Sequence, residues 1–344
     1  MNFLNRIEAF ISLGNILRDW KNSEYATSIH TSIQKQSIEN HWFPEEHIRF
    51  AIQAIGEMLQ EEQLRRISEK YADSFKNNTG IDQTIAVISS GNIPIAGFHD
   101  FFSVLICGCH YKGKLSKHDS ILLPALADIL TQLQPYFKNR ILFCDKLEKF
   151  DRIIMTGSNN SARYFEYYFG KYPHILRKNR NSIAILTGNE SDTELEKLFE
   201  DIFLYFGFGC RSVSMLFLPQ DYQFDKMIEV FTQKGKDIAQ HHHYLNNLDY
   251  QKTLYLMNRV HFIDAGLAIL VEKRELNSPI SVINFSYYLN ENEVSDFILS
   301  EKENIQCIVS ESEVRFGKAQ RPKIDDFADN IDVIQWITNC YNYA

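Results

Sequence analysis

The pattern of hydrophobic and polar residues divides the chain into a helical first part and a longer α/β part. Residues 1 to about 75 are polar and helix-like, with few glycines or prolines. From about residue 80, short β-rich runs alternate with runs of helical periodicity. Strands that alternate with helices predict a parallel, doubly wound sheet. The predicted strands are residues 85–88, 140–143, 152–155, 182–186, 213–218, 267–271, 280–285 and 305–309, and the predicted helices are residues 95–109, 161–170 and 192–206.

The helix predicted over residues 192–206 carries the most complete signals. Ser191 and Glu194 have the spacing of a capping box, in which each side chain bonds the backbone of the other residue. Apolar side chains then recur at helical spacing. We interpret this stripe as core packing rather than as the lining of an acyl-binding site: Leu195, Leu198, Phe199, Ile202, Phe203 and Phe206.

Composition and charge are those of a globular protein large enough for two domains. The 344 residues are 44% hydrophobic and 23% charged, and the formal net charge is −8. A negative chain does not present a general surface for nucleic acids or anionic membranes, so neither is expected as a partner. No stretch is long and apolar enough to span a bilayer. Arg6 and Glu8 interrupt the first apolar run, which predicts an amphipathic helix rather than a secretory signal.

The cysteines indicate a reducing compartment. They stand at positions 107, 109, 144, 210, 307 and 340, with no Cys-x-x-Cys pair and no disulfide-like density. Without a secretory signal, this usage predicts a cytoplasmic protein with free thiols.

Cys210 is the candidate nucleophile. It lies in the run Phe206-Gly-Phe-Gly-Cys-Arg-Ser-Val-Ser-Met-Leu-Phe-Leu-Pro219, between a helix-like and a strand-like segment. Two glycines allow the backbone to come close to the sulfur, and Arg211 follows it directly. Backbone N–H groups at a turn and a positive charge both favour the thiolate, which is the nucleophilic form of cysteine. The other five cysteines have no such setting.

Three loops between predicted elements could bind an anion. The segment that contains Thr156, Gly157 and Ser158 follows a strand and precedes a helix, where backbone N–H groups can hold a phosphate; an ordinary turn with a helix cap explains it equally well. Asn92 offers an amide donor suited to an oxyanion, or it belongs to a plain Asx turn. Residues 114–117 place two lysines around Ser116, which suits an anionic ligand or a solvated edge.

The remaining histidines and cysteines that stand out in the sequence have structural interpretations. His241-His-His243 could bind a metal, but adjacent positions on a helix point in different directions, so we interpret them as a solvated patch and expect no metal site. His99 could line the site near Asn92, or it is a structural histidine. Cys107 and Cys109 alternate within an apolar run and are interpreted as buried packing.

Taken in order, these motifs resemble the aldehyde dehydrogenase superfamily, and within it the acyl-CoA reductase branch that includes the LuxC-like fatty-acid reductases of bacterial luminescence. The resemblance runs from about Ile85 to the C-terminus. It rests on Gly91-Asn-Ile-Pro-Ile-Ala-Gly-Phe-His-Asp100, Met155-Thr-Gly-Ser-Asn-Asn-Ser-Ala-Arg163, Arg180-Asn-Ser-Ile-Ala-Ile-Leu-Thr-Gly-Asn-Glu190, Gly209-Cys-Arg-Ser-Val-Ser214, Gly317-Lys-Ala-Gln-Arg-Pro322 and Asp325-Asp-Phe-Ala-Asp-Asn-Ile-Asp332.

The resemblance implies roles for individual residues. Cys210 accepts the acyl group, and its backbone N–H forms an oxyanion hole with the Asn92 amide. Lys114 contacts the adenosine ribose, and Glu275 holds the nicotinamide ribose. The Phe-Gly pair of the family's Glu-x-Phe-Gly-Pro motif is Asn277-Ser278 here, which weakens the Glu275 assignment. The loop near the cofactor phosphates and the nicotinamide is Thr156, Gly157 and Ser158.

Two departures from the superfamily pattern are informative. Lys117 stands where many members carry an acid that binds ribose hydroxyls, so a 2′-phosphate is favoured and NADPH is expected over NADH. The glutamate that activates water in hydrolytic members would fall near residues 174–180, which hold no acid. Glu190 is nearby but stands at a helix start, where a capping charge is the default interpretation. A thioester reductase does not need to activate water, because its acyl-enzyme is reduced.

The resemblance therefore implies an α/β, aldehyde dehydrogenase-like fold and the NADPH-dependent reduction of a fatty acyl thioester to an aldehyde. We expect a helical segment over residues 1–80, an NAD(P)-binding domain over 81–205, a catalytic thiol domain over 206–320 and a C-terminal segment over 321–344. A homodimer formed by strand addition, as is frequent in the superfamily, is a further expectation. Two alternatives stay open: a reductase of a short activated acyl group such as an acyl phosphate, and a non-catalytic nucleotide-binding protein on the same fold.

Overall fold

The computed structural model describes residues 1–75 and 82–339. Cys340 and the expected domain boundary at residue 80 lie outside the described residues. The chain forms two compact units: one contains Met1–Asn179 and the residues from Pro322 onward, and the other contains Arg180–Arg321. Among the described residues, no helix combines the length and the apolar character that a membrane crossing requires.

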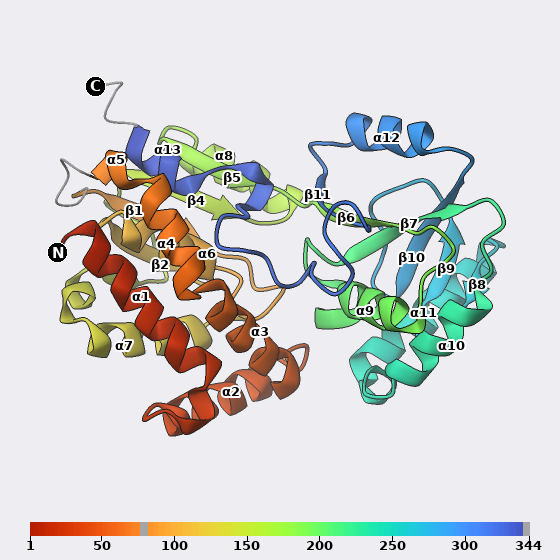
Figure 1. Ribbon diagram of the computed structural model, residues 1–344, viewed down its shortest axis with the longest axis horizontal. Helices are drawn as coiled ribbons and strands as arrows, with labels where there is room; N and C mark the ends of the chain where they lie inside the picture. The colour runs from red at the N-terminus through yellow and green to blue at the C-terminus, as the bar shows by residue number, and fades with distance from the viewer. Residues whose placement is uncertain (76–81, 340–344) are drawn as a thin grey trace. The chain divides into compact units, whose positions relative to one another are not determined.

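The first unit is built on a parallel sheet with the strand order β3-β2-β1-β4-β5. This order reverses direction at β1, as in a doubly wound dinucleotide-binding sheet. Figure 1 shows β1, β2, β4 and β5 within this unit. The strands are β1 (Thr84–Ile88), β2 (His110–Lys114), β3 (Ile141–Phe143), β4 (Arg152–Thr156) and β5 (His174–Arg177).

Helices cover both faces of this sheet because the crossovers on the two sides of β1 run in opposite directions. α6 (Phe98–Ile106) packs on β1 and β2, whereas α8 (Asn159–Phe169) packs on β4 and β5. Beneath α8, Ala86, Ile153 and Met155 form a buried cluster with aromatic side chains of the helix. The other helices of this unit are α1 (Phe3–Arg18), α2 (Ala26–Glu39), α3 (Glu45–Met58), α4 (Glu61–Lys70), α5 (Ala72–Phe75), α7 (Leu122–Leu133) and α13 (Val333–Asn339).

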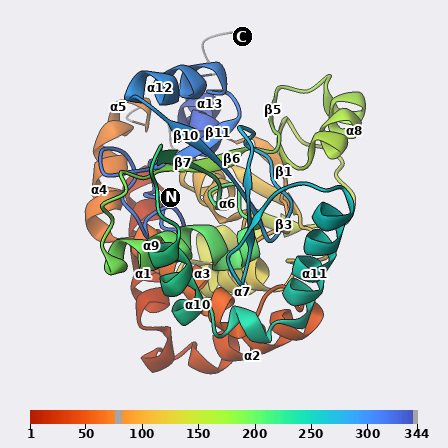
Figure 2. The ribbon, with the colours of Figure 1, turned by 90° about the vertical axis from the view of Figure 1, so that its right-hand side faces the viewer.

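The second unit is built on a sheet with the strand order β11-β6-β7-β10-β9-β8, parallel except for the pair β8–β9. Figures 1 and 2 show α12 on one side of this sheet and α9 and α10 on the other. The strands are β6 (Asn181–Ile185), β7 (Val213–Pro219), β8 (Ile263–Asp264), β9 (Ile269–Glu272), β10 (Val282–Tyr288) and β11 (Ile305–Val309), and the helices are α9 (Asp192–Phe203), α10 (Asp225–Lys234), α11 (His242–Met257) and α12 (Glu291–Ser300).

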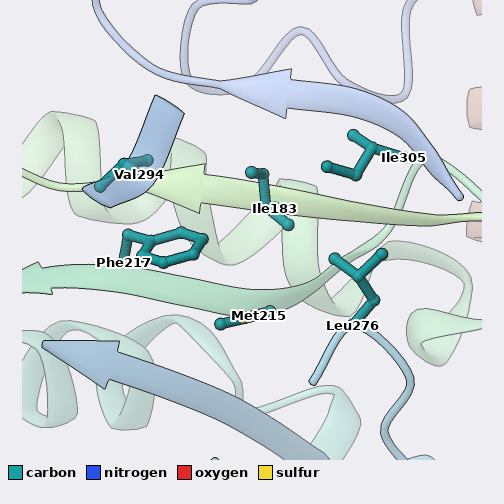
Figure 3. Packing of buried hydrophobic residues seen from close by; sticks show 6 residues of the cluster. All are labelled: Ile183, Met215, Phe217, Leu276, Val294 and Ile305. Atoms are coloured by element: carbon teal, nitrogen blue, oxygen red, sulfur yellow. The ribbon is translucent and has the colours of Figure 1, made fainter. Parts of the chain in front are cut away.

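The core of the second unit joins neighbouring strands to α12 (Figure 3). Ile183 from β6 lies between Phe217 of β7 and Ile305 of β11, and Val294 from α12 closes the cluster. Leu276 reaches the same cluster from the connection between β9 and β10. The core therefore fixes this connection, which carries Glu275, against the sheet.

The fold class agrees with the sequence, while some boundaries differ. The compact units divide after Asn179, because β6 pairs with β7 and β11 in the second sheet. α9 ends at Phe203, three residues before the predicted end, because Leu204 leaves the helical conformation with a ψ of 137° and Tyr205 is left-handed. The pattern did not reveal three short strands: β2, β5 and β8.

Candidate active site

One edge of the first sheet gathers the loops that the sequence singled out for cofactor binding. Ile88, at the end of β1, is in register with Lys114 of β2 and with Met155 of β4. The chain segments that leave these three strands therefore start at the same carboxyl edge. Ligands of doubly wound sheets bind at this edge, where the strand order reverses.

Gly91 brings the loop after β1 against the loop after β2. A Cβ at this position would lie 2.3 Å from Ser116 Oγ and 2.5 Å from Ser116 Cβ. Such distances are far below van der Waals contact, so any larger residue at Gly91 must displace Ser116. The glycine is thus required by close packing of the two loops rather than by an unusual backbone angle.

The lysine loop, residues 114–121, is braced by the N-terminal helices. Ser116 Oγ accepts a hydrogen bond from His118 N at 3.2 Å, which closes a local turn. The side-chain amides of Gln36 and Asn40 both donate to His118 O, at 2.9 and 3.1 Å. Gln36 of α2 and Asn40, the C-cap of this helix, are both buried. The loop is therefore ordered, and its two lysines, at positions 114 and 117, are exposed.

Asn92 lies in the strained loop that follows β1. Ser90 Oγ donates to Asn92 Oδ1 at 2.7 Å, which orients the side-chain amide. Ile95 has a φ of 60°, which is a strained conformation for a β-branched residue. Its N–H donates to buried Asp119 Oδ2 at 2.8 Å. Burial raises the pKa of Asp119 to about 7, although this backbone bond opposes the shift.

The loop after β4 begins a helix, as predicted. Ser158 is the N-cap of α8, and its hydroxyl accepts a hydrogen bond from Ser161 N at 3.2 Å. Gly157 N donates to Arg177 O, which ties the loop to β5. Backbone N–H groups of a first helical turn, hydroxyls and exposed lysines together form a donor set with positive charge. Such a set suits an anionic ligand such as a phosphate group.

Cys210 occupies a β-turn at the amino edge of the second sheet. Ser212 N donates to Gly209 O at 2.9 Å, which closes the turn around the cysteine. Ser182 Oγ, at the start of β6, donates to Cys210 O at 3.0 Å. Of the five cysteines within the described residues, Cys210 is the exposed one, and Cys107, Cys109 and Cys307 are buried.

The backbone just before Cys210 is strained. Tyr205 and Phe206 have φ values of 56° and 55°, and Gly207 follows with 79°. A left-handed conformation of a bulky residue costs about 1–3 kcal/mol, and it persists only where the surroundings enforce it. Both aromatic side chains are buried, and the Phe206 ring packs on the tilted ring of His241 at a centroid distance of 4.2 Å. We call residues 204–212 the cysteine loop.

Arg211 anchors the cysteine loop, a role that its position next to Cys210 did not predict. Its Nε donates to Ala319 O at 2.5 Å, and its Nη2 lies 3.7 Å from Cys307 Sγ. The guanidinium thus links the loop to β11 and to the segment after it.

Glu275 lies in the same unit as Cys210, on the connection between β9 and β10. Ser214, at the start of β7, donates from its hydroxyl to Leu276 O at 2.6 Å, which places this connection against the strand that follows Cys210. The Glu275 carboxylate is exposed and forms an ion pair with Lys273 at 2.8 Å. Ribose hydroxyls would have to compete with this ion pair.

Glu190 has a structural role, although not the helix-capping role that its position suggested. Its carboxylate accepts hydrogen bonds from Thr187 N, Thr187 Oγ1 and Gly188 N, which closes the turn after β6. This turn follows the carboxyl end of β6, whereas Ser182 at the amino end holds Cys210. The extended chain from Ser182 to Leu186 spans about 13 Å. Glu190 is therefore too far from Cys210 to act as its base. The predicted capping box of Ser191 and Glu194 is confirmed.

The singled-out histidines have structural partners. His99 Nε2 bonds Ile324 O at 2.8 Å, and burial lowers the pKa of its imidazole. His241 is the N-cap of α11 and accepts a hydrogen bond from Tyr244 N. Within residues 1–75 and 82–339, no group of three or more histidine, cysteine or acidic residues is arranged to hold a metal.

Sequence reasoning missed two buried carboxylates, Asp119 and Asp201. Burial raises the pKa of both to about 7. Asp201 is fully buried and accepts hydrogen bonds from Gly317 N and Ala319 N. The available signal for Asp201 was its position between Leu198 and Ile202, within the apolar stripe of α9.

Comparisons with known proteins place the fold. No protein-family model and no curated protein sequence matches the chain. Among solved structures, aldehyde dehydrogenase 21 from Physcomitrella patens, in complex with the reaction product succinate, has a TM-score of 0.69 at 12% identity and covers 98% of this chain and 84% of its own. The NAD+ complex of an aldehyde dehydrogenase from Bacillus cereus has a TM-score of 0.61 at 12% identity, over 90% of this chain and 72% of its own.

An oxidoreductase from Marinobacter aquaeolei is similar to the same extent, with a TM-score of 0.65 at 10% identity over 90% of this chain and 73% of its own. At such low identities the likeness concerns the path of the backbone. The chain has the aldehyde dehydrogenase fold.

Proposed function

We propose that this protein reduces a fatty acyl thioester, acyl-CoA, to an aldehyde, with NADPH as the cofactor and Cys210 as the nucleophile. The observation that carries the proposal is the setting of Cys210 in an aldehyde dehydrogenase fold. Its side chain is exposed, while the loop that carries it is strained and held by buried aromatic rings. Strain that the packing maintains is typical of functional sites.

The carboxyl edge of the first sheet would hold the cofactor. Lys114 would contact the adenosine ribose, and Lys117 with Ser116 would bind a 2′-phosphate. The first turn of α8, with Thr156, Gly157 and Ser158 before it, would face the pyrophosphate. When bound, the reduced nicotinamide supplies the hydride that converts the acyl group to an aldehyde. NAD+ complexes of proteins with this fold support a nicotinamide nucleotide as the cofactor class.

Cys210 would form the covalent intermediate. The thiolate attacks the thioester carbonyl, a new carbon–sulfur bond forms, and the bond to the CoA sulfur breaks as CoA leaves as its thiolate. After reduction, collapse of the thiohemiacetal releases the aldehyde and returns the sulfur of Cys210. The negative oxygen of the tetrahedral stage needs donors, and we assign the Cys210 N–H and the Asn92 amide to this task.

The two places where a base was expected support reduction over hydrolysis. Residues 174–180 contain no acid, and Glu190 is bonded at the other end of β6. Where neither of these positions activates water, an acyl-enzyme lasts long enough to accept hydride. Glu275 would hold the nicotinamide ribose after it releases Lys273.

Two further properties belong to this proposal. The five described cysteines are free thiols, which suits a reducing, cytoplasmic setting. The second sheet has the edge strands β8 and β11, and a homodimer could form by strand addition at such an edge.

The test is NADPH oxidation with a panel of acyl-CoA esters of increasing chain length, with an acyl phosphate and an acyl carrier thioester in the same panel. We expect turnover with acyl-CoA and formation of the matching aldehyde. Turnover with the acyl phosphate and with no thioester would mean that the substrate is an acyl phosphate rather than acyl-CoA. A chain that turns over no substrate and whose Cys210 resists alkylation at neutral pH would be a nucleotide-binding protein on an enzyme fold.

A further inference from the structure

Asp201 of α9 binds one short segment with both of its carboxylate oxygens. Oδ2 accepts a hydrogen bond from Gly317 N at 2.6 Å, and Oδ1 accepts one from Ala319 N at 3.0 Å. Gly317 has a φ of 78°, which presents the two amides to the same carboxylate. We call residues 317–320 the clasp segment.

The clasp segment is bonded in turn to the two residues that follow Cys210. Ala319 O accepts a hydrogen bond from Arg211 Nε at 2.5 Å. Gln320 Nε2 donates to Ser212 Oγ at 3.2 Å. Ala319, Gln320 and Ser212 are all buried, so water does not compete for these bonds. The cysteine loop is therefore tied on one side to the clasp segment and on the other, through Cys210 O, to β6.

We propose that Asp201 is a positioning residue for Cys210, which it controls through the clasp segment and Arg211. This proposal rests on the proposed function in one respect: the positioned thiol is the group that accepts an acyl group. If the hydrogen bonds of Asp201 are lost, the clasp segment shifts, and the turn that carries Cys210 shifts with it.

The hold of Asp201 on the clasp segment also depends on pH. Burial raises the pKa of Asp201 to about 7, against the effect of the two N–H donors and of Arg211, and with a smaller contribution from Glu200 in the same direction as burial. The stem of Lys197 packs against Gly317. As a carboxylate, Asp201 accepts both amides strongly. Once protonated, it carries a hydrogen on one oxygen and binds them less well, so the clasp loosens as the pH falls below 7.

The experiment follows alkylation of Cys210 by iodoacetamide from pH 5.5 to 9, read by mass spectrometry of the Cys210 peptide. The variants are Asp201→Asn and, as a matched control on the same helix, Glu200→Gln, which removes an exposed charge. In the unaltered protein we expect two ionisations in the rate profile, one of the thiol and one near pH 7. Asp201→Asn should retain only the ionisation of the thiol, and Glu200→Gln should keep both.

A profile of Asp201→Asn that superimposes on that of the unaltered protein would overturn the proposal. If this variant does not fold, Gln320→Ala decides: a several-fold change in the plateau rate supports the clasp, and an unchanged rate rejects it. The readout needs no acyl-CoA turnover. Failure of the clasp therefore leaves the proposed function intact, and a Cys210→Ala variant that still turns over substrate would overturn the function alone.

Discussion

The loop after β1 and the cysteine loop use the same physical device in two separate units. In the first, Ile95 is left-handed and its N–H is bonded by buried Asp119. In the second, Tyr205 and Phe206 are left-handed, and buried Asp201 acts on the loop through the clasp segment. Each loop carries a residue proposed for chemistry, and burial raises the pKa of each carboxylate to about 7.

The difference between the two loops lies in how directly the carboxylate acts. Asp119 bonds the strained residue itself, whereas Asp201 reaches the cysteine loop through Ala319 and Arg211. A direct bond confines a loop to one shape, while a relayed one leaves it coupled to a further segment. The first arrangement suits a fixed donor such as Asn92, and the second suits a nucleophile whose loop passes through several covalent stages. The predictions below run from the largest expected effect on activity to the smallest.

Cys210→Ala should abolish activity while cofactor binding stays intact, because the two tasks are assigned to different units. Incubation with acyl-CoA should give no mass increase from an acyl group, and the Kd for NADPH should stay within about twofold, well under the tenfold that 1.4 kcal/mol represents. Cys144→Ala, in the first unit, serves as the control and should form acyl-enzyme normally. If the Cys210→Ala protein still becomes acylated, the nucleophile does not lie in the cysteine loop.

Asn92→Ala should reduce kcat by about 10²–10³-fold, the loss measured when one oxyanion donor is removed. NADPH binding should change little, as judged by fluorescence titration. Ser90→Ala removes only the bond that orients the Asn92 amide, so it should cost a smaller, few-fold loss. Equal losses for the two variants would mean that the loop supports the fold rather than an oxyanion.

Lys117→Glu should weaken NADPH binding by about tenfold, or about 1.4 kcal/mol, and leave NADH binding equal or improved. The reason is that a carboxylate would repel a 2′-phosphate and attract ribose hydroxyls. Lys138→Glu introduces the same charge change at another exposed lysine of this unit and should have no such effect. Equal or tighter binding of NADH than of NADPH to the unaltered protein would already refute the preference.

Asp119→Asn should alter stability more than activity. The main change should be in how the free energy of unfolding depends on pH. Because the pKa is raised from 3.8 to about 7 in the folded state, the protein favours the protonated form, and this contribution is lost as the pH rises through about 4 to 7. The loss is at most about 4 kcal/mol. Urea unfolding across this range should give a shallower decline for Asp119→Asn. Asp201→Asn should show the same sign, and opposite signs would break the parallel between the two loops.

Local signals explain what the sequence predicted well. The capping box at Ser191, the alternation of strands and helices, and the glycine-rich turn at Cys210 each depend on neighbouring residues, and the structure contains all three features. β2 escaped prediction because His110-Tyr-Lys-Gly-Lys114 is polar and contains glycine. Only its position between β1 and β3 makes it a strand.

Long-range contacts explain what the sequence could not give. The bonds from Gln36 to the lysine loop and from Asp201 to the clasp segment join residues 82 to 118 positions apart. Nothing in the sequence around Gln36 or Asp201 indicates which distant segment each side chain binds. The same holds for the division after Asn179, which depends on the pairing of β6 with β7 and β11.

The sequence by itself determined the fold class, the candidate thiol and the residue types at the carboxyl edge of the first sheet, because periodicity and turn chemistry act over a few residues. The tertiary structure decided that Glu190 closes a turn far from Cys210, that Arg211 anchors the cysteine loop, and that two buried aspartates hold the strained loops. These decisions depend on desolvation and on hydrogen bonds between distant segments, which exist only once the sheets have assembled.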